Sequence, residues 1–446
     1  MSAISSVRES LSFSLLLKLI SVVFTLVSAR YMGVASFGEM FVSQQLLVSL
    51  SLFFLKETFR REAQRTDLSV GFAWLSVFCS LGLACVLGIF WVYWLAADSL
   101  VVQLLLIAVS CEALAEPWLY MRLQKADYAC KIRAETIANL ARSVALAFIV
   151  YFGKGGRLEH LSFGLAQLCY SLIWCLVIIK GTSPPIVIAC SFPPGFMNLL
   201  GLSSLKLILT EIEKFFLLAW FDATAWAQFG IVSNFGSLIL RTFFAPIEDV
   251  AFSAFSRGDF VSLAPIFFLQ TAVGLAAPAF GPAVASEAVT ILYGNFWASQ
   301  NGVVQLLQFY CLLIFLCAVN GITEAHFFAT ASAEKIKNAH SRQILAAVLQ
   351  IFTSFAMSSF GPVALIAGNA VGMIVRIIGC WSSVFTEVVF TNLSSYLYIT
   401  TGGVASLAIL LLQTSTLTRL SFVIPLAVVS LLPAARSFLS LQKKSD

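Results

Sequence analysis

Apolar runs of about 20 residues recur along the whole chain, separated by short polar segments. A run of this length crosses the hydrocarbon of a bilayer as one α-helix. The pattern therefore predicts an all-α polytopic membrane protein with about fourteen transmembrane helices. We place these helices at roughly 11–32, 38–56, 70–96, 99–120, 135–152, 161–180, 198–220, 226–247, 262–292, 303–331, 342–359, 362–384, 394–413 and 418–440. Two of them are longer than a span requires, and Pro278 and Pro282 predict a kink in the first of these.

Composition agrees with this pattern. Hydrophobic residues make up 59% of the 446 residues and charged residues only 11%, with a mean hydropathy of +0.92. A soluble fold cannot cover that much apolar surface. The polar loops are too short to form a soluble domain, so any function must lie within the bilayer or at its two faces.

The strongest interruption of the pattern is a Pro/Gly-rich segment at 181–197. It follows the sixth predicted span and divides the chain into an N-terminal six-helix bundle (1–180) and a C-terminal six-helix bundle (198–390). Residues 391–446 add two peripheral helices and a basic tail. A shift of about 192 residues aligns Glu57 with Asp249 and Arg30 with Asp222. The layout predicts a parallel repeat of the two bundles with a polar cleft between them, where transporters of this kind bind substrate.

The distribution of basic residues predicts the orientation in the membrane. With both termini in the cytosol, the cytosolic ends of the predicted helices hold roughly seventeen Lys and Arg and the opposite ends about four. An odd number of helices would destroy this asymmetry. We therefore expect both termini on the cytosolic side.

One segment concentrates charge at the end of an apolar run. Residues 55–62 read Leu-Lys-Glu-Thr-Phe-Arg-Arg-Glu, with five charges in seven residues. An ionised side chain at the bilayer centre costs at least about 2.5–3.5 kcal/mol, so such charges pair with each other, reach water or contact a ligand. Arginine suits a phosphate or diphosphate because it binds the oxygens in bidentate fashion and keeps its charge on burial.

Further ionisable residues lie within or beside the other apolar runs. Each of these residues could form a salt bridge between helices or contact a ligand. For Arg30, Arg60 and Arg61, anchoring at the membrane interface is a third alternative. Glu211 and Lys214 stand three residues apart on one helix face, and we expect them to pair. The remaining charges are Glu112, Glu116, Glu135, Arg142, Glu213, Asp222, Arg241, Glu248, Asp249, Glu324, His326 and Arg376.

The sequence gives little indication of a disulfide framework, a metal site or a nucleotide-binding loop. The ten cysteines form no CxxC pair and the three histidines lie in separate segments, so neither a disulfide framework nor a metal site is expected. The glycine-rich residues 153–156 lack the spacing of a phosphate-binding P-loop. We predict no enzyme activity, no cofactor and no nucleic-acid partner.

Four segments together resemble the Rft family of eukaryotic membrane proteins, within the multidrug/oligosaccharidyl-lipid/polysaccharide exporter superfamily. Residues 53–61 (FFLKETFRR) are similar to its FxREAFRR segment, and residues 112–117 (EALAEP) to its ELxxEP motif. Residues 209–214 (LTEIEK), with 234–249, resemble its LTEGEK and NNxGSLxxRxxFxPIEE segments, and residues 320–325 (NGITEA) its NGxTEAF motif. The chain departs from these patterns at Lys56, Ile212, Asp249 and His326.

The resemblance implies a role in moving a dolichyl-diphosphate-linked oligosaccharide from the cytosolic to the lumenal leaflet of the endoplasmic reticulum membrane, for protein N-glycosylation and without ATP. Membrane lipids and proteins of the glycosylation pathway are the other expected partners. On this basis, Arg60, Arg61 and Arg241 would hold the diphosphate and Arg30 would receive it at the lumenal end. Sugar hydroxyls would contact Glu57, Glu211, Glu248, Asp249 and Glu324. Lys214 and Arg376 complete the candidate site.

Two rival functions stay open. A non-transporting scaffold or chaperone of the dolichol-linked pathway would have the same charges paired in a dry interface. A small-solute or drug antiporter of the same fold would show ion dependence and an apolar cleft. The transporter and its two rivals predict different net charges for the surface on which the arginines lie, so that charge distinguishes them.

Overall fold

The computed structural model describes residue 17 and residues 20–59, 70–124, 128–180, 196–256, 263–331, 333–411 and 416–445. Every regular element in these ranges is a helix, as expected where the backbone must satisfy its own hydrogen bonds in lipid. Within them, nine helices are long and apolar enough to span a membrane: Gly71–Tyr93, Ser99–Leu123, Cys130–Gly153, Arg157–Ile179, Leu263–Tyr293, Gly302–Thr330, Val363–Cys380, Leu393–Leu411 and Leu420–Ser437. The multi-pass helical class is confirmed, whereas the count of fourteen and the repeat stay predictions.

The chain divides into two compact units, Met1–Ala227 and Gln228–Asp446. The division lies inside α11 (Ala223–Ile239), and α10 (Phe196–Trp220) belongs to the first unit. Residues 181–195 of the expected linker lie outside the described residues, and the domain boundaries drawn from the sequence stay predictions.

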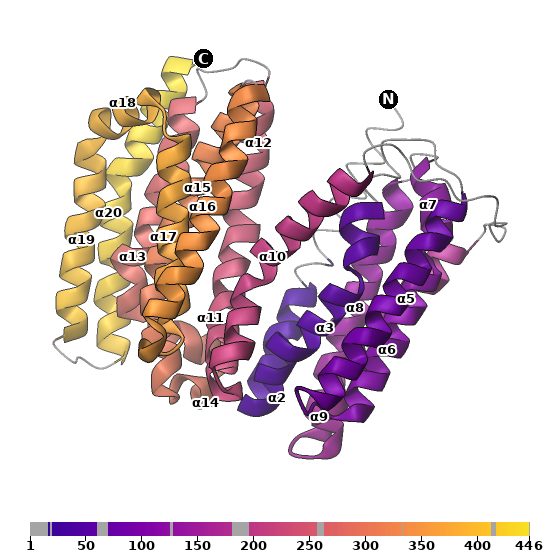
Figure 1. Cartoon of the computed structure of the whole chain (residues 1–446). Coiled ribbons are helices and arrows are strands. Elements are labelled where there is room, and N and C mark those ends of the chain that lie inside the picture. The colour runs from indigo at the N-terminus through magenta and orange to yellow at the C-terminus, as the bar shows by residue number, and fades with distance from the viewer. Residues whose placement is uncertain are drawn as a thin grey trace. The chain divides into compact units, whose positions relative to one another are not determined.

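The first unit is a bundle around α6 (Ser99–Leu114), α8 (Tyr128–Gly153) and α9 (Arg157–Ile179). In it, α9 packs along both α6 and α8, and α5 (Val70–Tyr93) covers α6 (Figure 1). Gly164 permits the close approach of α9 to α6, since a Cβ there would lie 3.2 Å from Leu104 Cβ. Trp174 and Ile178 of α9 are fully buried against α7 (Glu116–Gln124) and α8.

A helical stretch that follows the helix Ile20–Tyr31 alternates between α and π geometry. It runs through α2 (Val34–Glu39), η1 (Met40–Gln44), α3 (Gln45–Ser51) and η2 (Phe54–Phe59). Short π segments inside helices are often found at functional sites. The η2 segment contains Lys56 and Glu57, so the charged helix end expected from the sequence is also a site of irregular backbone.

The second unit is built on the pair α13 (Leu263–Tyr293) and α15 (Asn301–Thr330). Four elements contact this pair: η3 (Leu240–Phe244), α12 (Ala245–Ser256), α14 (Asn295–Ala298) and α17 (Val363–Cys380). On α17 pack α16 (Ala333–Ala356) and η4 (Ser358–Phe360). α13 stays one helix with both Pro278 and Pro282 inside it. The Gln308 side chain of α15 donates a hydrogen bond to the Pro282 carbonyl at 3.1 Å, which binds the two helices together in the proline-containing half.

The last two helices, α19 (Leu393–Leu411) and α20 (Thr416–Ser445), follow α18 (Ser383–Thr391). Both pack against α13 and against each other, and in Figure 1 they run side by side at the edge of their unit. The Ser406 hydroxyl donates to the Ala279 carbonyl at 2.7 Å, and Thr271 and Tyr396 hydroxyls lie 2.7 Å apart. These bonds join α19 to the core of the unit.

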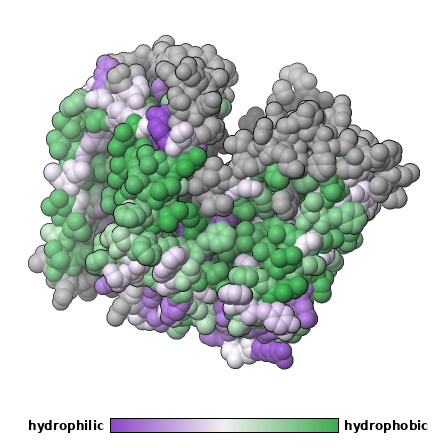
Figure 2. All heavy atoms as spheres, viewed as in Figure 1, coloured by the Kyte–Doolittle hydropathy of each residue, from purple (hydrophilic) through white to green (hydrophobic). Residues whose placement is uncertain are grey.

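Apolar side chains cover much of the outside of each unit, as a helical membrane protein requires. Figure 2 shows hydrophobic residues over the middle of the visible face of each unit and hydrophilic residues toward its ends. The exposed apolar residues include Phe78 and Ile89 on α5 and Phe352 and Phe355 on α16. Such continuous apolar exposure is the pattern of a lipid-facing surface.

Close packing of α19 on α13 makes a stability prediction. A Cβ at Gly403 would lie 2.8 Å from Ala279 Cβ and 2.9 Å from its Cα, whereas a Cβ at Gly82 would meet nothing within 4 Å. We expect Gly403→Val to lower the stability of the purified protein by about 1–3 kcal/mol, the usual cost of overpacking. Gly82→Val carries the same helix-propensity change and should alter thermal unfolding far less. Equal unfolding temperatures for the two variants would contradict the packing described for α19.

Candidate substrate site

Some charged residues of the first unit meet in a polar network that includes a buried carboxylate. Lys56 Nζ of η2 is 3.0 Å from Glu112 Oε1 of α6. The Glu112 side chain is 1% exposed and the Lys56 side chain 39%. The pair therefore joins a nearly inaccessible carboxylate to a cation that still reaches the surface.

A second cation approaches the same carboxylate from α8. Arg142 is partly buried and interacts electrostatically with Glu112. Its Nη1 donates to Gln167 Oε1 of α9 at 3.2 Å, and its guanidinium lies 5.6 Å from the centre of the Tyr170 ring. Burial of one carboxylate between two cations compensates for its loss of water.

The predicted pairing of Glu211 and Lys214 in α10 is confirmed. Lys214 Nζ lies 2.9 Å from Glu211 Oε2, with the two side chains 20% and 14% exposed. The same ammonium also lies 5.9 Å from the centre of the Phe41 ring of η1. Both charges are thus held where α10 packs on the irregular helix of the first unit.

Arg30 lies exposed near the end of the helix Ile20–Tyr31. Nearby, Glu159 at the start of α9 accepts hydrogen bonds from the backbone N–H of Gly33 at 2.6 Å and of Gly155 at 2.7 Å. Glu39 and His160 approach to 3.4 Å next to them. The carboxylate of Glu159 therefore fixes two loops at this end of the unit, which the sequence pattern did not indicate.

The second unit has its own buried polar cluster, formed where α12, α13 and α15 meet. Gln270 of α13 is completely buried, and its Nε2 donates to Glu248 Oε1 and to the Ala318 carbonyl, at 2.9 Å in each case. Glu248 lies directly on α15, because a Cβ at Gly321 would overlap its carboxylate. A larger residue at position 321 would displace this carboxylate from its present position.

The cluster continues one turn along α15. Glu324 accepts a hydrogen bond from the side chain of Asn320 and is attracted electrostatically to Arg376 of α17. The structure thus brings three of the expected site residues, Glu248, Glu324 and Arg376, to the Asn320–Glu324 segment. Sequence reasoning missed Gln270 and Asn320, although an amide inside an apolar helix is the signal that would have found them.

The remaining candidates are described only in part. Arg60 and Arg61 lie outside the described residues. Glu57 belongs to η2, Arg241 to η3 and Asp249 to α12, with only the backbone of each described. Two of the three therefore occur in π-helical turns.

Metal and redox chemistry gain no support from the described part of the chain. There, no group of three or more His, Cys, Asp or Glu residues is arranged to hold a metal ion. The nine cysteines in these ranges form no disulfide with one another.

Comparison with protein families matches the chain to the family model described as Rft protein, over residues 2–183 and 195–440. This chain belongs to the Rft family.

Its relatives include three whole-length matches. The mouse protein named Man(5)GlcNAc(2)-PP-dolichol translocation protein RFT1 is 28% identical, over 83% of this chain and 79% of its own length. Proteins of the same name from Xenopus tropicalis and Caenorhabditis elegans are 26% and 24% identical. They cover 82% and 89% of this chain and 79% and 88% of their own lengths.

Two solved structures share the fold of this Rft chain. The lipid II flippase MurJ, in an inward closed conformation, superposes with a TM-score of 0.68 over 97% of this chain and 99% of its own, at 12% identity. A multidrug resistance MATE family transporter, in an inward-facing conformation, gives a TM-score of 0.54 over 89% and 96%, at 15% identity. Both likenesses are ones of fold.

The Rft motifs seen in the sequence lie on the two polar clusters. The segments 53–61 and 112–117 supply Lys56 and Glu112 in the first unit. The segments 234–249 and 320–325 supply Glu248, Gly321 and Glu324 in the second. The residues that mark the family are thus the ones that place charge inside the helical units.

The Lys56–Glu112 pair makes a prediction about stability. Lys56→Met leaves the Glu112 carboxylate with one cation fewer, and we expect it to cost roughly 1–3 kcal/mol. Adding Glu112→Gln should recover part of that loss, because the buried carboxylate that lost its lysine is then neutral, while Arg142 keeps its hydrogen bond to Gln167. Thermal unfolding of the single and double variants measures the coupling.

The pair Lys131–Glu135 is the matched control, since it is also a Lys–Glu pair but its atoms are 3.8 Å apart and both side chains reach water. Lys131→Met should change stability by no more than about 0.5 kcal/mol. The buried-pair interpretation fails if Lys56→Met is as mild as Lys131→Met.

Proposed function

We propose that this protein transports a dolichyl-diphosphate-linked oligosaccharide across the endoplasmic reticulum membrane, from the cytosolic to the lumenal leaflet and without hydrolysing ATP. The observation that carries the proposal is the whole-length family match to proteins named for Man(5)GlcNAc(2)-PP-dolichol translocation. The transporter-like fold supports it. Protein N-glycosylation is the process that such transport would serve.

The chemistry of the buried clusters supports an anionic, hydroxyl-rich ligand. Arginine and lysine bind diphosphate oxygens, and carboxylates and amides accept or donate hydrogen bonds to sugar hydroxyls. Arg60, Arg61 and Arg241 would hold the diphosphate, with Arg30 near the lumenal end. The carboxylates of Glu57, Glu211, Glu248, Asp249 and Glu324 would contact sugar or orient the cations, among them Lys214 and Arg376.

The polyprenyl tail needs no polar site, because it stays in lipid while the headgroup moves. The protein would therefore lower the cost of taking a charged sugar headgroup through hydrocarbon, which is the only large barrier in the process. No covalent bond changes in this step, so neither an enzyme nor a cofactor is required.

A scaffold of the dolichol-linked pathway is the second candidate function. It is favoured by the pairing of described charges, as in Lys56–Glu112 and Glu211–Lys214. This candidate requires translocation to proceed normally in vesicles without the protein, with glycosylation impaired in cells that lack it.

Translocation by the purified protein separates the two functions. In vesicles loaded with Man(5)GlcNAc(2)-PP-dolichol, we expect the protein to speed the appearance of lipid in the opposite leaflet, measured by protection from a membrane-impermeant glycan-binding or glycan-cleaving reagent. Arg60→Ala combined with Arg241→Ala should slow transport at least about tenfold, the equivalent of one lost charge-assisted hydrogen bond.

Lys131→Ala combined with Arg157→Ala is the matched control, because it removes the same charge from side chains that reach the surface of the first unit. This control should transport at the wild-type rate. Unchanged transport in the Arg60/Arg241 variant would reject the site assignment, and no acceleration by wild-type protein would favour the scaffold.

A further inference from the structure

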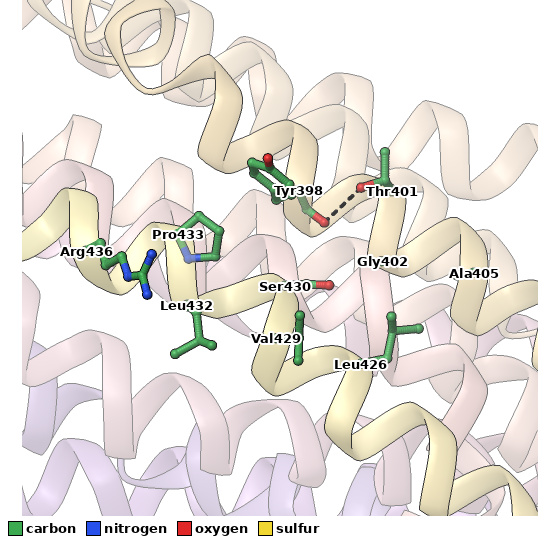
Figure 3. Close-up of a pocket in the computed structure, with 10 residues that line it drawn as sticks. All are labelled: Tyr398, Thr401, Gly402, Ala405, Leu426, Val429, Ser430, Leu432, Pro433 and Arg436. Atoms are coloured by element: carbon green, nitrogen blue, oxygen red, sulfur yellow. Dashed lines mark hydrogen bonds between the residues drawn. The ribbon is translucent and has the colours of Figure 1, made fainter.

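A groove runs along the second unit between α19 and α20. It has a volume of about 430 Å³, within the range of roughly 300–1,000 Å³ typical of small-molecule sites. Figure 3 shows α20 carrying Arg436 at one end of the groove and Leu426 toward the other, with α19 alongside. The lining includes Tyr398, Thr401 and Ala405 from α19 and Leu426, Ser430 and Arg436 from α20.

The floor of the groove is held in place by close contacts. Gly402 lets Ser430 approach α19, since a Cβ there would lie 2.9 Å from Ser430 Cβ. At the end that carries Arg436, the hydroxyls of Ser395 and Ser437 lie 2.8 Å apart. These two contacts hold α19 and α20 together, so the groove is part of the packed unit.

The length of the groove matches one leaflet of a bilayer. Arg436 is the last residue but one of the candidate span Leu420–Ser437, so it lies at a membrane boundary. Leu426 is ten residues earlier, about 15 Å deeper at 1.5 Å per residue. That distance is half of a hydrocarbon core of about 30 Å, so the groove reaches from the headgroup region to the bilayer centre.

The two ends of the groove differ in chemistry. Leu426, Val429 and Ala405 present an apolar surface in the deeper part. At the boundary, Arg436 is exposed, and Lys443 and Lys444 follow it on the same helix α20. Each Lys or Arg near the surface contributes about 1 kcal/mol to attraction of anionic lipid.

We propose that this groove binds one acyl chain of an anionic glycerophospholipid, with the lipid phosphate at Arg436. A phospholipid chain spans one leaflet, as the groove does, whereas a long polyprenyl chain exceeds it. The bound lipid is thus a membrane component distinct from the transported one. The lipid would fill the groove between α19 and α20. The proposal does not depend on translocation activity.

Native mass spectrometry of the whole protein in detergent tests this site. With added phosphatidylinositol or phosphatidylglycerol, we expect bound lipid to exceed that found with phosphatidylcholine. Arg436→Gln should reduce retention of the anionic lipid about fivefold, the factor that corresponds to about 1 kcal/mol. Arg157→Gln removes an exposed cation from the first unit and should leave retention unchanged.

A second pair of variants tests the groove without altering charge. Ala405 lines the groove, so Ala405→Trp should fill it and abolish retention, whereas Ala408→Trp places the same side chain at an exposed position of α19 outside the lining. Circular dichroism and gel filtration confirm that each variant is folded. Equal retention of anionic and zwitterionic lipids, retention unaffected by both Arg436→Gln and Ala405→Trp, or displacement of phospholipid by equimolar dolichyl phosphate would each overturn the proposal.

Discussion

Hydrocarbon offers no water to a charge or to an unpaired amide, and this constraint accounts for most of what the structure shows. It requires helices throughout the described ranges, and it requires each buried charge to find a partner on a neighbouring helix. Glu112 between Lys56 and Arg142, and Glu248 beside Gln270, are two solutions of the same problem. Because those partners come from different helices, they also fix which helices can be neighbours. The polar clusters therefore specify packing that apolar contacts alone would leave less well defined.

The sequence predicts well what depends on local pattern. Hydrophobic runs located the spanning helices, and the three-residue spacing of Glu211 and Lys214 predicted their pair. Contacts between distant segments had no such signal: Lys56 and Glu112 are 56 positions apart, and Glu248 meets Gln270 only because α12 and α13 fold together. The glycine at 321 is a clear example, since its need for space beside Glu248 is visible only once α12 lies on α15. The π segments likewise left no mark in the hydrophobic pattern.

Fold and chemistry are encoded by different residues in this chain. The likeness to MurJ extends over nearly the whole of both chains at 12% identity, because many apolar side chains of suitable volume can fill the same helical bundle. A few residues within the apolar helices carry the family resemblance, among them the carboxylates Glu112 and Glu324 and the glycine Gly321. A change in ligand within one fold then requires the replacement of few side chains. The fold alone therefore does not specify the ligand, whereas the sparse charges constrain it.

Pairing of buried charges and recognition of an anionic ligand are compatible, because a diphosphate can replace a carboxylate as the partner of a cation. The two members of the Lys56–Glu112 pair differ in their access to the surface. Glu112 is 1% exposed and cannot leave without great cost, whereas Lys56, 39% exposed on a π-helical segment, has access to the surface. Exchange would move the cation toward the ligand while Arg142 continues to compensate the carboxylate that stays behind. Because Arg142 also acts on Glu112, this carboxylate would keep a cationic neighbour if Lys56 turned toward a phosphate.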